Sequence, residues 1–252
     1  ARLRGHVRWA AAEANGCAYA QAVAEADLLE AGCTDVDCKR LAGSPDFLPP
    51  VDRAAVAFAR KMMRRAQTVT DEEVQQLIDL LGEERVVALV ALLAHASFQD
   101  RLFLALGLGP ELDAALPPQA ARFVLPPPVP PPAGSSQPPA RGNPEDDDEP
   151  GGKQPPEDNR WSDFQERLEE QRKRTARIRV PSQDEVIQRI GAQHPSQWQS
   201  EILWSRVCYG YQPELTDAWF STVAAYRQES SLDPLLQQSI FWVVTESLEC
   251  FY

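Results

Sequence analysis

Apolar residues recur at helical spacing along the first hundred residues of the chain. Positions three and four apart are apolar in four stretches, 9–29, 51–65, 70–81 and 83–106. Gly32 and Gly82 follow two of these stretches, where glycine commonly ends a helix. Thr70 and Glu73 have the spacing of a capping box. Since no stretch alternates apolar and polar positions as a strand does, the pattern predicts an all-α fold, with 83–106 as its most buried helix.

Helical spacing returns in the last part of the chain. The pattern predicts helices over 161–179, 182–191, 198–209 and 214–228, and a last helix that begins at Pro234. Ser182 and Glu185 again form a capping box, and Gly191 follows as the end of that short helix. Pro234 suits the first turn of a helix, because the N–H that proline lacks has no helical partner there.

Prolines divide the chain between these two regions. Of the 22 prolines, 15 lie between Pro110 and Pro156, together with the acidic block Glu145–Glu149. Such a segment has too few apolar residues to offset the entropy that ordering it would cost. An extended or disordered linker is therefore expected, with a docking segment for a proline-binding domain as the alternative. We predict a helical module over 1–115, a linker over 116–159 and a second helical module over 160–252.

Composition narrows the classes of partner. The formal net charge is −12, which argues against nucleic acids and anionic membranes because both repel an acidic surface. The longest apolar run, Val86–Ala94, is about half of what a bilayer-spanning helix needs. Five cysteines cannot all pair, so we expect a reducing, cytoplasmic compartment. The chain starts without Met and ends at Tyr252 in a predicted helix, so we also expect a fragment.

One short pattern occurs twice, 233 residues apart. Residues 9–19 and 242–252 share the pattern W-x3-E-x3-C-x-Y. Tryptophan and cysteine are rare in this chain, so their coincidence in one register indicates two copies of one helical module. A spacing of four places Trp9, Glu13 and Cys17 in one stripe along a helix. We therefore expect the same stripe in the second copy.

The first copy resembles a known family. Asn15–Ala20 looks like a variant of the N-G-C-x-Y-C-x-x-x-H signature of the alkylhydroperoxidase D / carboxymuconolactone decarboxylase family. The resemblance covers about residues 5–108 and extends over four further segments, Ala57–Lys61, Val69–Asp71, Leu80–Glu84 and Ala94–Arg101. It implies an all-helical fold that forms homo-oligomers and, for peroxidase members, reduction of a peroxide by a cysteine thiol.

The resemblance also implies which groups carry that chemistry. In family peroxidases one thiol becomes a sulfenic acid, a second thiol three residues later resolves it, and a His and an upstream Glu relay protons. Here Cys17 matches the first thiol, but Ala20 stands at the second thiol, Ala24 at the His and Gly5 at the Glu. The first copy should therefore not run a two-cysteine cycle. The upstream Glu position of the second copy is Gln238.

These matches define the candidate site residues. The catalytic candidates are the thiols Cys17 and Cys250 and the neighbouring carboxylates Glu13 and Glu246, and the candidates for substrate binding are Tyr19, Tyr252 and His95. A carboxylate beside a thiol disfavours the thiolate, so a structural role for Cys17 is the first alternative. The second is an inactive scaffold or small-molecule-binding module. The implied partners are a peroxide, a thiol reductant and further copies of the chain, with no cofactor.

The remaining cysteines give weaker indications of a functional role than Cys17 and Cys250. Cys33 and Cys38 are five residues apart with no histidine close in sequence, which is poor spacing for a zinc site, so no metal is expected. Either they are ordinary residues of a turn between helices, or one of them resolves an oxidised Cys17. Cys208 lies in an aromatic stretch and reads as a packing residue.

Overall fold

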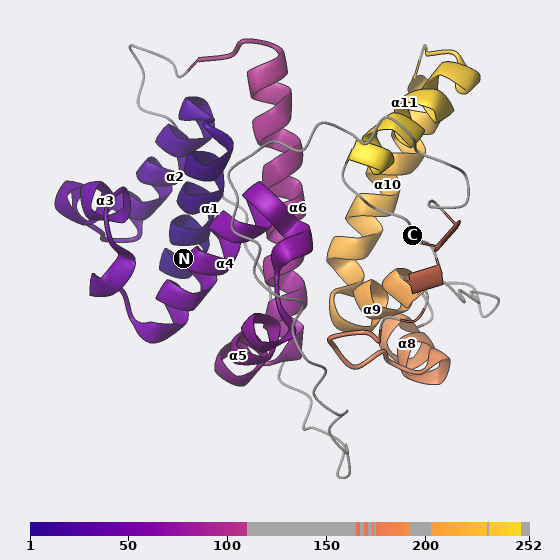
Figure 1. The fold of residues 1–252 in the computed structure, drawn as a ribbon, viewed down its shortest axis with the longest axis horizontal. Helices are drawn as coiled ribbons and strands as arrows, with labels where there is room; N and C mark the ends of the chain where they lie inside the picture. Colours follow the sequence, from indigo (N-terminus) through magenta and orange to yellow (C-terminus); the bar gives the residue numbers. More distant parts are fainter. Residues whose placement is uncertain are drawn as a thin grey trace.

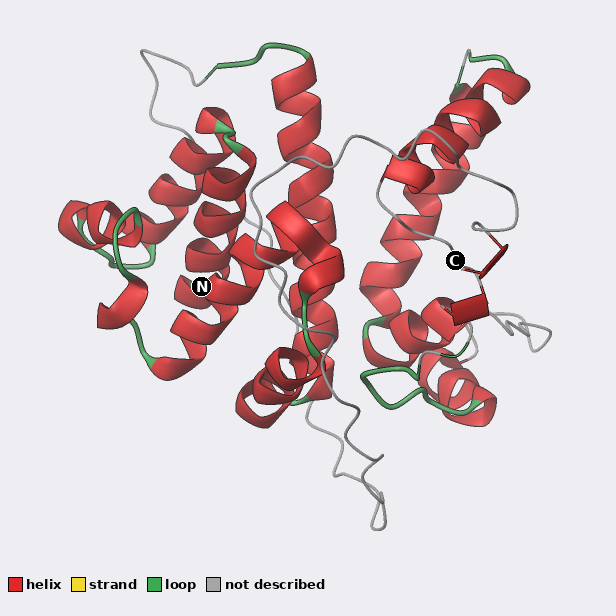
Figure 2. Cartoon of the chain, viewed as in Figure 1, coloured by secondary structure: helices red, strands yellow, loops and turns green. Residues whose placement is uncertain are grey.

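The computed structural model describes residues 1–109, 165–166, 169–170, 173, 175–191, 203–230 and 232–247. Over these residues the chain is helical, and no strand occurs among them (Figure 2). The prediction of an all-α fold is therefore confirmed. The α-helices are α1 (Arg2–Asn15), α2 (Ala18–Glu30), α3 (Asp35–Leu41), α4 (Pro50–Arg65), α5 (Asp71–Leu81), α6 (Glu83–Ala105), α8 (Gln183–Ile190), α9 (Leu203–Tyr211), α10 (Pro213–Glu229) and α11 (Pro234–Ser247), and short 3-10 turns cover Pro45–Phe47 and Ala66–Thr68.

Helix α1 is the centre of the first bundle. It packs against α2, α4 and α6 (Figure 1). Every residue from Gly5 to Ala12 is buried. Three of these residues are alanines, which let the neighbouring helices approach closely. Trp9 fills the middle of the core, and its indole Nε1 donates to Glu25 Oε1 of α2 at 3.0 Å. This bond satisfies the one polar atom of a buried tryptophan.

The predicted helix over 9–29 is wrong, because the chain breaks at Gly16. Gly16 has a left-handed backbone, with φ of 70°, and its N–H bonds back to the last turn of α1. Glycine takes this conformation without steric cost, so it ends α1. Cys17 is then the N-cap of α2. The stripe that was expected to join Trp9, Glu13 and Cys17 on one helix therefore does not exist.

Other predicted helix boundaries are close to the observed ones. The capping box of Thr70 and Glu73 opens α5, and that of Ser182 and Glu185 opens α8, each with both reciprocal bonds. One more prediction is wrong: residues 175–182 of the described chain are not helical, although a helix was expected to reach residue 179. The start of that predicted helix, the linker over 116–159 and residues 198–202 lie outside the described residues.

Helix α6 is long and apolar but is not the most buried helix, contrary to prediction. It has 23 residues, and its best window reaches a mean hydropathy of 1.4, so by length and composition it is able to cross a membrane. One face packs on the first bundle, with Asp100 and Leu93 buried. Phe98, Leu102 and Leu104 on other faces are exposed. The apolar composition of α6 thus exceeds what its packing buries.

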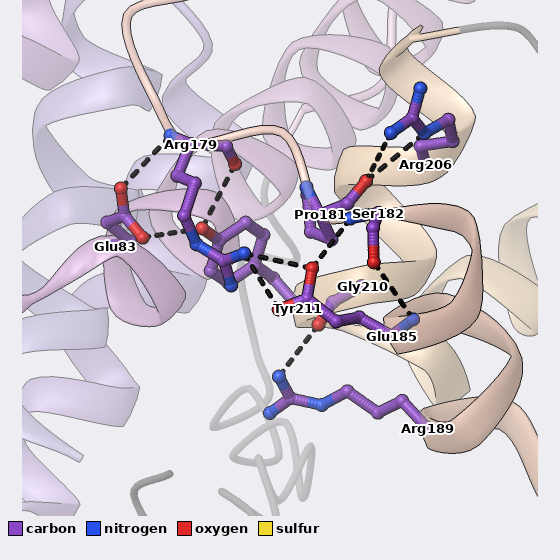
Figure 3. A network of polar contacts seen from close by, with 9 residues as sticks. All are labelled: Glu83, Arg179, Pro181, Ser182, Glu185, Arg189, Arg206, Gly210 and Tyr211. Atoms are coloured by element: carbon purple, nitrogen blue, oxygen red, sulfur yellow. Dashed lines mark hydrogen bonds and ion pairs between the residues drawn. The ribbon is translucent and has the colours of Figure 1, made fainter. Parts of the chain in front are cut away.

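The second helical region is attached to the first residues of α6. Figure 1 shows α6 between α1–α5 and the helices α8–α11. Glu83 accepts bonds from the Tyr211 hydroxyl at 2.5 Å and from the Arg179 N–H at 3.0 Å (Figure 3). Arg189 pairs with Glu84 at 3.2 Å. Burial, followed by the bond to Glu83, raises the pKa of Tyr211, so this tyrosine stays a neutral donor.

Within the second region, α8, α9 and α10 share a small core. Val186 and Ile190 of α8 pack with Tyr209 of α9 and Phe220 of α10. Gly210 allows α9 to lie directly against Pro181, since a Cβ at that position would come within 2.4 Å of the proline ring. Arg206 donates to the Pro181 carbonyl at 2.6 Å, which fixes the same contact (Figure 3).

The packing of α1 on α2 gives a first prediction. A Cβ on Gly5 would lie 2.7 Å from Leu28 Cδ2 and 2.8 Å from its Cγ, and Leu28 is fully buried. Gly5→Ala gains about 1 kcal/mol of helix propensity. The overlap costs about 3 kcal/mol, the upper end of the usual range for overpacking, because Leu28 has no free space to enter, so the net loss is about 2 kcal/mol. We expect a lower free energy of unfolding for the variant, measured by urea denaturation.

Gly43→Ala is the matched control. The nearest atom to its added methyl group is the Arg40 carbonyl oxygen at 3.6 Å, an ordinary contact. We expect this control to unfold within about 0.5 kcal/mol of the parent protein. A Gly5→Ala protein as stable as the parent would contradict the close approach of α1 and α2.

Candidate functional site

Cys17 lies in a closed apolar pocket between α1, α2 and α6. Its side chain is 1% exposed and packs with Ala12, Ala20, Tyr19 and Phe103. The rings of Tyr19 and Phe103 are 4.6 Å apart between centroids and lie against this cluster. The Cys17 N–H donates to the Ala12 carbonyl at 2.9 Å. In this arrangement the sulfur has no open path to a dissolved substrate.

The positions at which the first copy departs from the family pattern are packed positions. Ala20 and Ala24 are buried in α2, at 1% and 2% exposed, and each belongs to a cluster of packed apolar residues. Gly5 has no room for even a methyl group, because Leu28 occupies that space. A glutamate at position 5 would therefore require α1 and α2 to separate. Core contacts occupy the positions at which the resemblance led us to expect relay groups.

Glu13 is held by arginines of α4. Its Oε2 accepts from Arg60 Nε at 3.0 Å, and its Oε1 lies 3.8 Å from Arg64 Nη2. Arg60 also donates to the Leu41 carbonyl at 2.6 Å, so one side chain connects α1, α4 and the end of α3. An ion pair of this kind fixes the carboxylate and compensates its charge. Glu13 thus has a structural contact in place of the expected position in a stripe with Cys17.

A buried polar group spans α1 and α6 near the same pocket. Asp100 is 1% exposed, and its Oδ2 accepts from Asn15 Nδ2 at 2.8 Å. Among the described residues, Asp100 Oδ1 and the buried Arg8 Nη1 have no hydrogen-bond partner. Burial lowers the pKa of Arg8, while the charge of Asp100 opposes this shift. Burial likewise raises the pKa of Asp100, against the effects of Asn15 and Arg8. Each of the two charges therefore favours the charged form of the other group.

The remaining candidates from the sequence are not part of the cluster around Cys17, or they lie outside the residues that the structure describes. His95 is on α6 with its side chain exposed, and partial desolvation followed by the charge of Arg8 lowers its pKa. Glu246 is in α11, but its side chain is outside the described residues, as are Cys250 and Tyr252. Their roles remain predictions.

The structure brings together three residues that the sequence analysis did not connect. His6 Nδ1 lies 2.7 Å from Asp52 Oδ2, and Cys33 Sγ lies 3.9 Å from His6 Nε2. His6 comes from α1, Cys33 from the turn after α2, and Asp52 from the first turn of α4. His6 is buried, whereas Cys33 and Asp52 are partly exposed. The two ring nitrogens face opposite ways, so the groups form a line from carboxylate to imidazole to thiol.

This line had no signal in the sequence. The three residues are 27 and 46 positions apart, so no local motif joins them. Within the described ranges, no three His, Cys, Asp or Glu side chains form a group that would hold a metal ion. The line of groups at His6 is suited to moving a proton between the thiol and the imidazole.

The pair of buried charges gives a second prediction. Asp100→Asn keeps an acceptor for Asn15 but removes the larger of the two carboxylate charges that favour the charged form of Arg8, so that only the charge of Asp27 remains. We expect a loss of about 2 kcal/mol in the free energy of unfolding, measured by urea denaturation at neutral pH. Arg8→Met in the same chain removes the second charge, so the double variant should recover at least about 1 kcal/mol of that loss. Additive losses from the two substitutions would contradict the coupling.

Comparisons of this chain with protein-family models, with curated proteins and with solved structures find no match. The function therefore has to be argued from the residues and their geometry.

Proposed function

We propose that this chain is a helical thiol peroxidase of the alkylhydroperoxidase D type, with its reactive thiol at Cys250 and a structural first copy of the motif. The observation that carries the assignment of the first copy is the closed pocket of Cys17, which is 1% exposed with Ala20 beside it. A peroxide cannot reach that sulfur, and no second thiol stands at the resolving position. We therefore assign the reaction with peroxide to Cys250, the equivalent thiol in the second copy of the motif.

The two copies differ in the surroundings of their tryptophans. Trp9 of α1 is 2% exposed inside the first bundle, whereas Trp242 of α11 is 53% exposed. Val243 and Val244, which stand where α1 has the buried Ala10 and Ala11, are exposed as well. The proposed two-module arrangement assigns to α11 the part that α1 plays in the first bundle. The open surroundings of this helix favour it as the reactive copy.

The proposed reaction is a two-electron reduction of a hydroperoxide. The Cys250 thiolate attacks the terminal peroxide oxygen, an S–O bond forms, the O–O bond breaks, and an alcohol and a sulfenic acid result. A thiol reductant then forms a disulfide with that sulfur and releases water, and a second thiol regenerates Cys250. Glu246, one turn before Cys250 in the repeat, is the proposed group that tunes the thiol.

A scaffold role for the first bundle has its own support. Phe98, Leu102 and Leu106 follow one another at a spacing of four along the end of α6, and all three are exposed. Such a stripe is typical of a surface covered by another protein. We assign the covering partner to a second copy of this chain, since the family resemblance implies homo-oligomers. The first bundle would then hold subunits together while the second copy reacts.

Two single substitutions test the placement of the thiol. In a chain that carries Cys33→Ser, so that this partly exposed thiol does not contribute, we expect Cys250→Ser to lower peroxide consumption by at least about 100-fold, because it removes the nucleophile. Cys17→Ser should stay within about twofold of the parent protein, because the buried thiol takes no part. The measurement is loss of hydrogen peroxide in the presence of dithiothreitol. Full activity of the Cys250→Ser protein, or loss of activity in Cys17→Ser alone, would contradict the proposal.

The stripe on α6 gives a separate prediction. Leu102→Lys places a charge in the proposed contact between subunits, so the dissociation constant should rise at least about tenfold. Analytical ultracentrifugation over a range of concentrations measures it. Leu80→Lys is the matched control, because Leu80 is an exposed leucine on α5, away from the stripe. A parent protein that is monomeric at every concentration, or an unchanged constant in Leu102→Lys, would overturn the assignment.

A further inference from the structure

We propose that Cys33, His6 and Asp52 form a second thiol site, in which Cys33 reacts with small hydroperoxides. The geometry carries this inference. Cys33 Sγ lies 3.9 Å from His6 Nε2, and His6 Nδ1 lies 2.7 Å from Asp52 Oδ2. A nucleophile beside a base that is oriented by a third group is the arrangement that activates a thiol. The site goes beyond the proposed function, which assigns no chemistry to the first bundle.

Asp52 determines which nitrogen of His6 carries the proton. An ionised carboxylate only accepts hydrogen bonds, so the 2.7 Å contact requires His6 Nδ1–H to donate to Asp52. In the neutral ring Nε2 is then an acceptor, and it faces the thiol of Cys33. His6 is 5% exposed, so the surrounding helices fix the ring in this orientation. The imidazole is therefore placed to take the thiol proton.

The turn that carries Cys33 is held by several contacts. Gly32 has a left-handed backbone, with φ of 83°, and the Cys33 N–H donates to the Leu28 carbonyl at 3.0 Å. Arg2 Nε donates to the Ala31 carbonyl at 3.0 Å, and its Nη2 to the Gly32 carbonyl at 3.3 Å. Arg2 and His6 are four residues apart on α1, so one helix face holds both the turn and the base. The sulfur is thus presented by a fixed backbone.

The exposure of the three groups decides which of them meets the substrate. Cys33 is partly exposed, whereas the imidazole behind it is buried and Asp52 contacts the far nitrogen. An incoming molecule therefore meets the sulfur and not the ring. This suits a small electrophile such as hydrogen peroxide, which needs one open direction along the line of attack.

The charges around Cys33 explain why a base is needed. Burial raises the pKa of the Cys33 thiol, Asp37 of α3 and Asp52 of α4 act in the same direction, and Arg2 of α1 opposes them. The resting thiol therefore keeps its proton. His6 Nε2 removes that proton as the sulfur attacks, and the guanidinium of Arg2 favours the negative charge that develops.

The step balances without a cofactor. Cys33 Sγ forms a bond to the terminal oxygen of the hydroperoxide while the O–O bond breaks, so sulfur loses two electrons and the peroxide gains them. The departing alkoxide or hydroxide takes a proton from water and leaves as an alcohol or water, and His6 returns its proton to the solvent. The product is a sulfenic acid on Cys33. A low-molecular-weight thiol then forms a mixed disulfide with release of water, and a second one restores the Cys33 thiol.

The test measures sulfenic acid at each cysteine of the full-length chain. Reduced protein carrying Cys250→Ser is treated with hydrogen peroxide and dimedone, and the labelled positions are followed over time by peptide mass spectrometry. Cys208 is the internal control, because it is also partly exposed and burial alone raises its pKa. We expect Cys33 to be labelled at least about tenfold faster than Cys208. Equal rates at the two residues would overturn the proposal.

Two substitutions separate catalysis from packing. His6→Gln removes the base and should slow the labelling of Cys33 by about 100-fold. Asp52→Asn keeps an acceptor for His6 Nδ1 but loses the charge, so a slowing of about tenfold is expected, whereas a merely structural Asp52 would show none. Unfolding would instead accelerate the labelling of the buried Cys38 in either variant. An unchanged Cys33 rate in Asp52→Asn contradicts the proposal even where His6→Gln does not fold.

This experiment and the test of the proposed function fail independently. Peroxide turnover that persists in Cys250→Ser and is lost in Cys33→Ser would contradict the assignment of Cys250 and support the site at Cys33. Turnover that depends on Cys250, together with Cys33 labelled no faster than Cys208, would support the assignment of Cys250 and contradict the site at Cys33.

Discussion

The close approach of α2 to α1 is the contact on which the rest of the first bundle depends. Leu28 occupies the space that a side chain on Gly5 would need, with less than 3 Å between its atoms and the position of a Cβ. The same approach brings the turn after α2 over His6 and sets Cys33 beside the ring. One packing contact therefore excludes a glutamate from position 5. The same contact places Cys33 beside His6, the next residue along α1.

The polar contacts of α1 are the second constraint. Glu13 pairs with Arg60, His6 bonds to Asp52, and the carboxylates Asp100 and Asp27 favour the charged form of the buried Arg8. A buried charge without a partner is costly, so these contacts fix how α4 and α6 are placed around α1. In this bundle the polar residues close to the motif stabilise the packing of helices. The closed pocket of Cys17 is the physical reason for assigning the chemistry of the motif to the second copy.

The sequence predicts the helices better than the site. Capping boxes at Thr70 and Ser182 and the glycines after them are local signals, and the helices begin and end where these signals stand. The break at Gly16 escapes prediction because alanines on both sides continue the helical pattern, although Asn-Gly is itself a turn signal. The line of Cys33, His6 and Asp52 depends on how three separate segments pack, and no spacing in the sequence encodes it.

The central claim is that, within the first bundle, the motif thiol Cys17 is closed and Cys33 is the accessible thiol that we propose to react. The most direct measurement is the rate at which each cysteine of the native, reduced protein reacts with iodoacetamide, resolved by peptide mass spectrometry. The account predicts that Cys33 reacts while Cys17 stays protected until the protein unfolds globally, so that the rate at Cys17 follows the unfolding equilibrium in added urea. Reaction of Cys17 as fast as Cys33 without urea would contradict it.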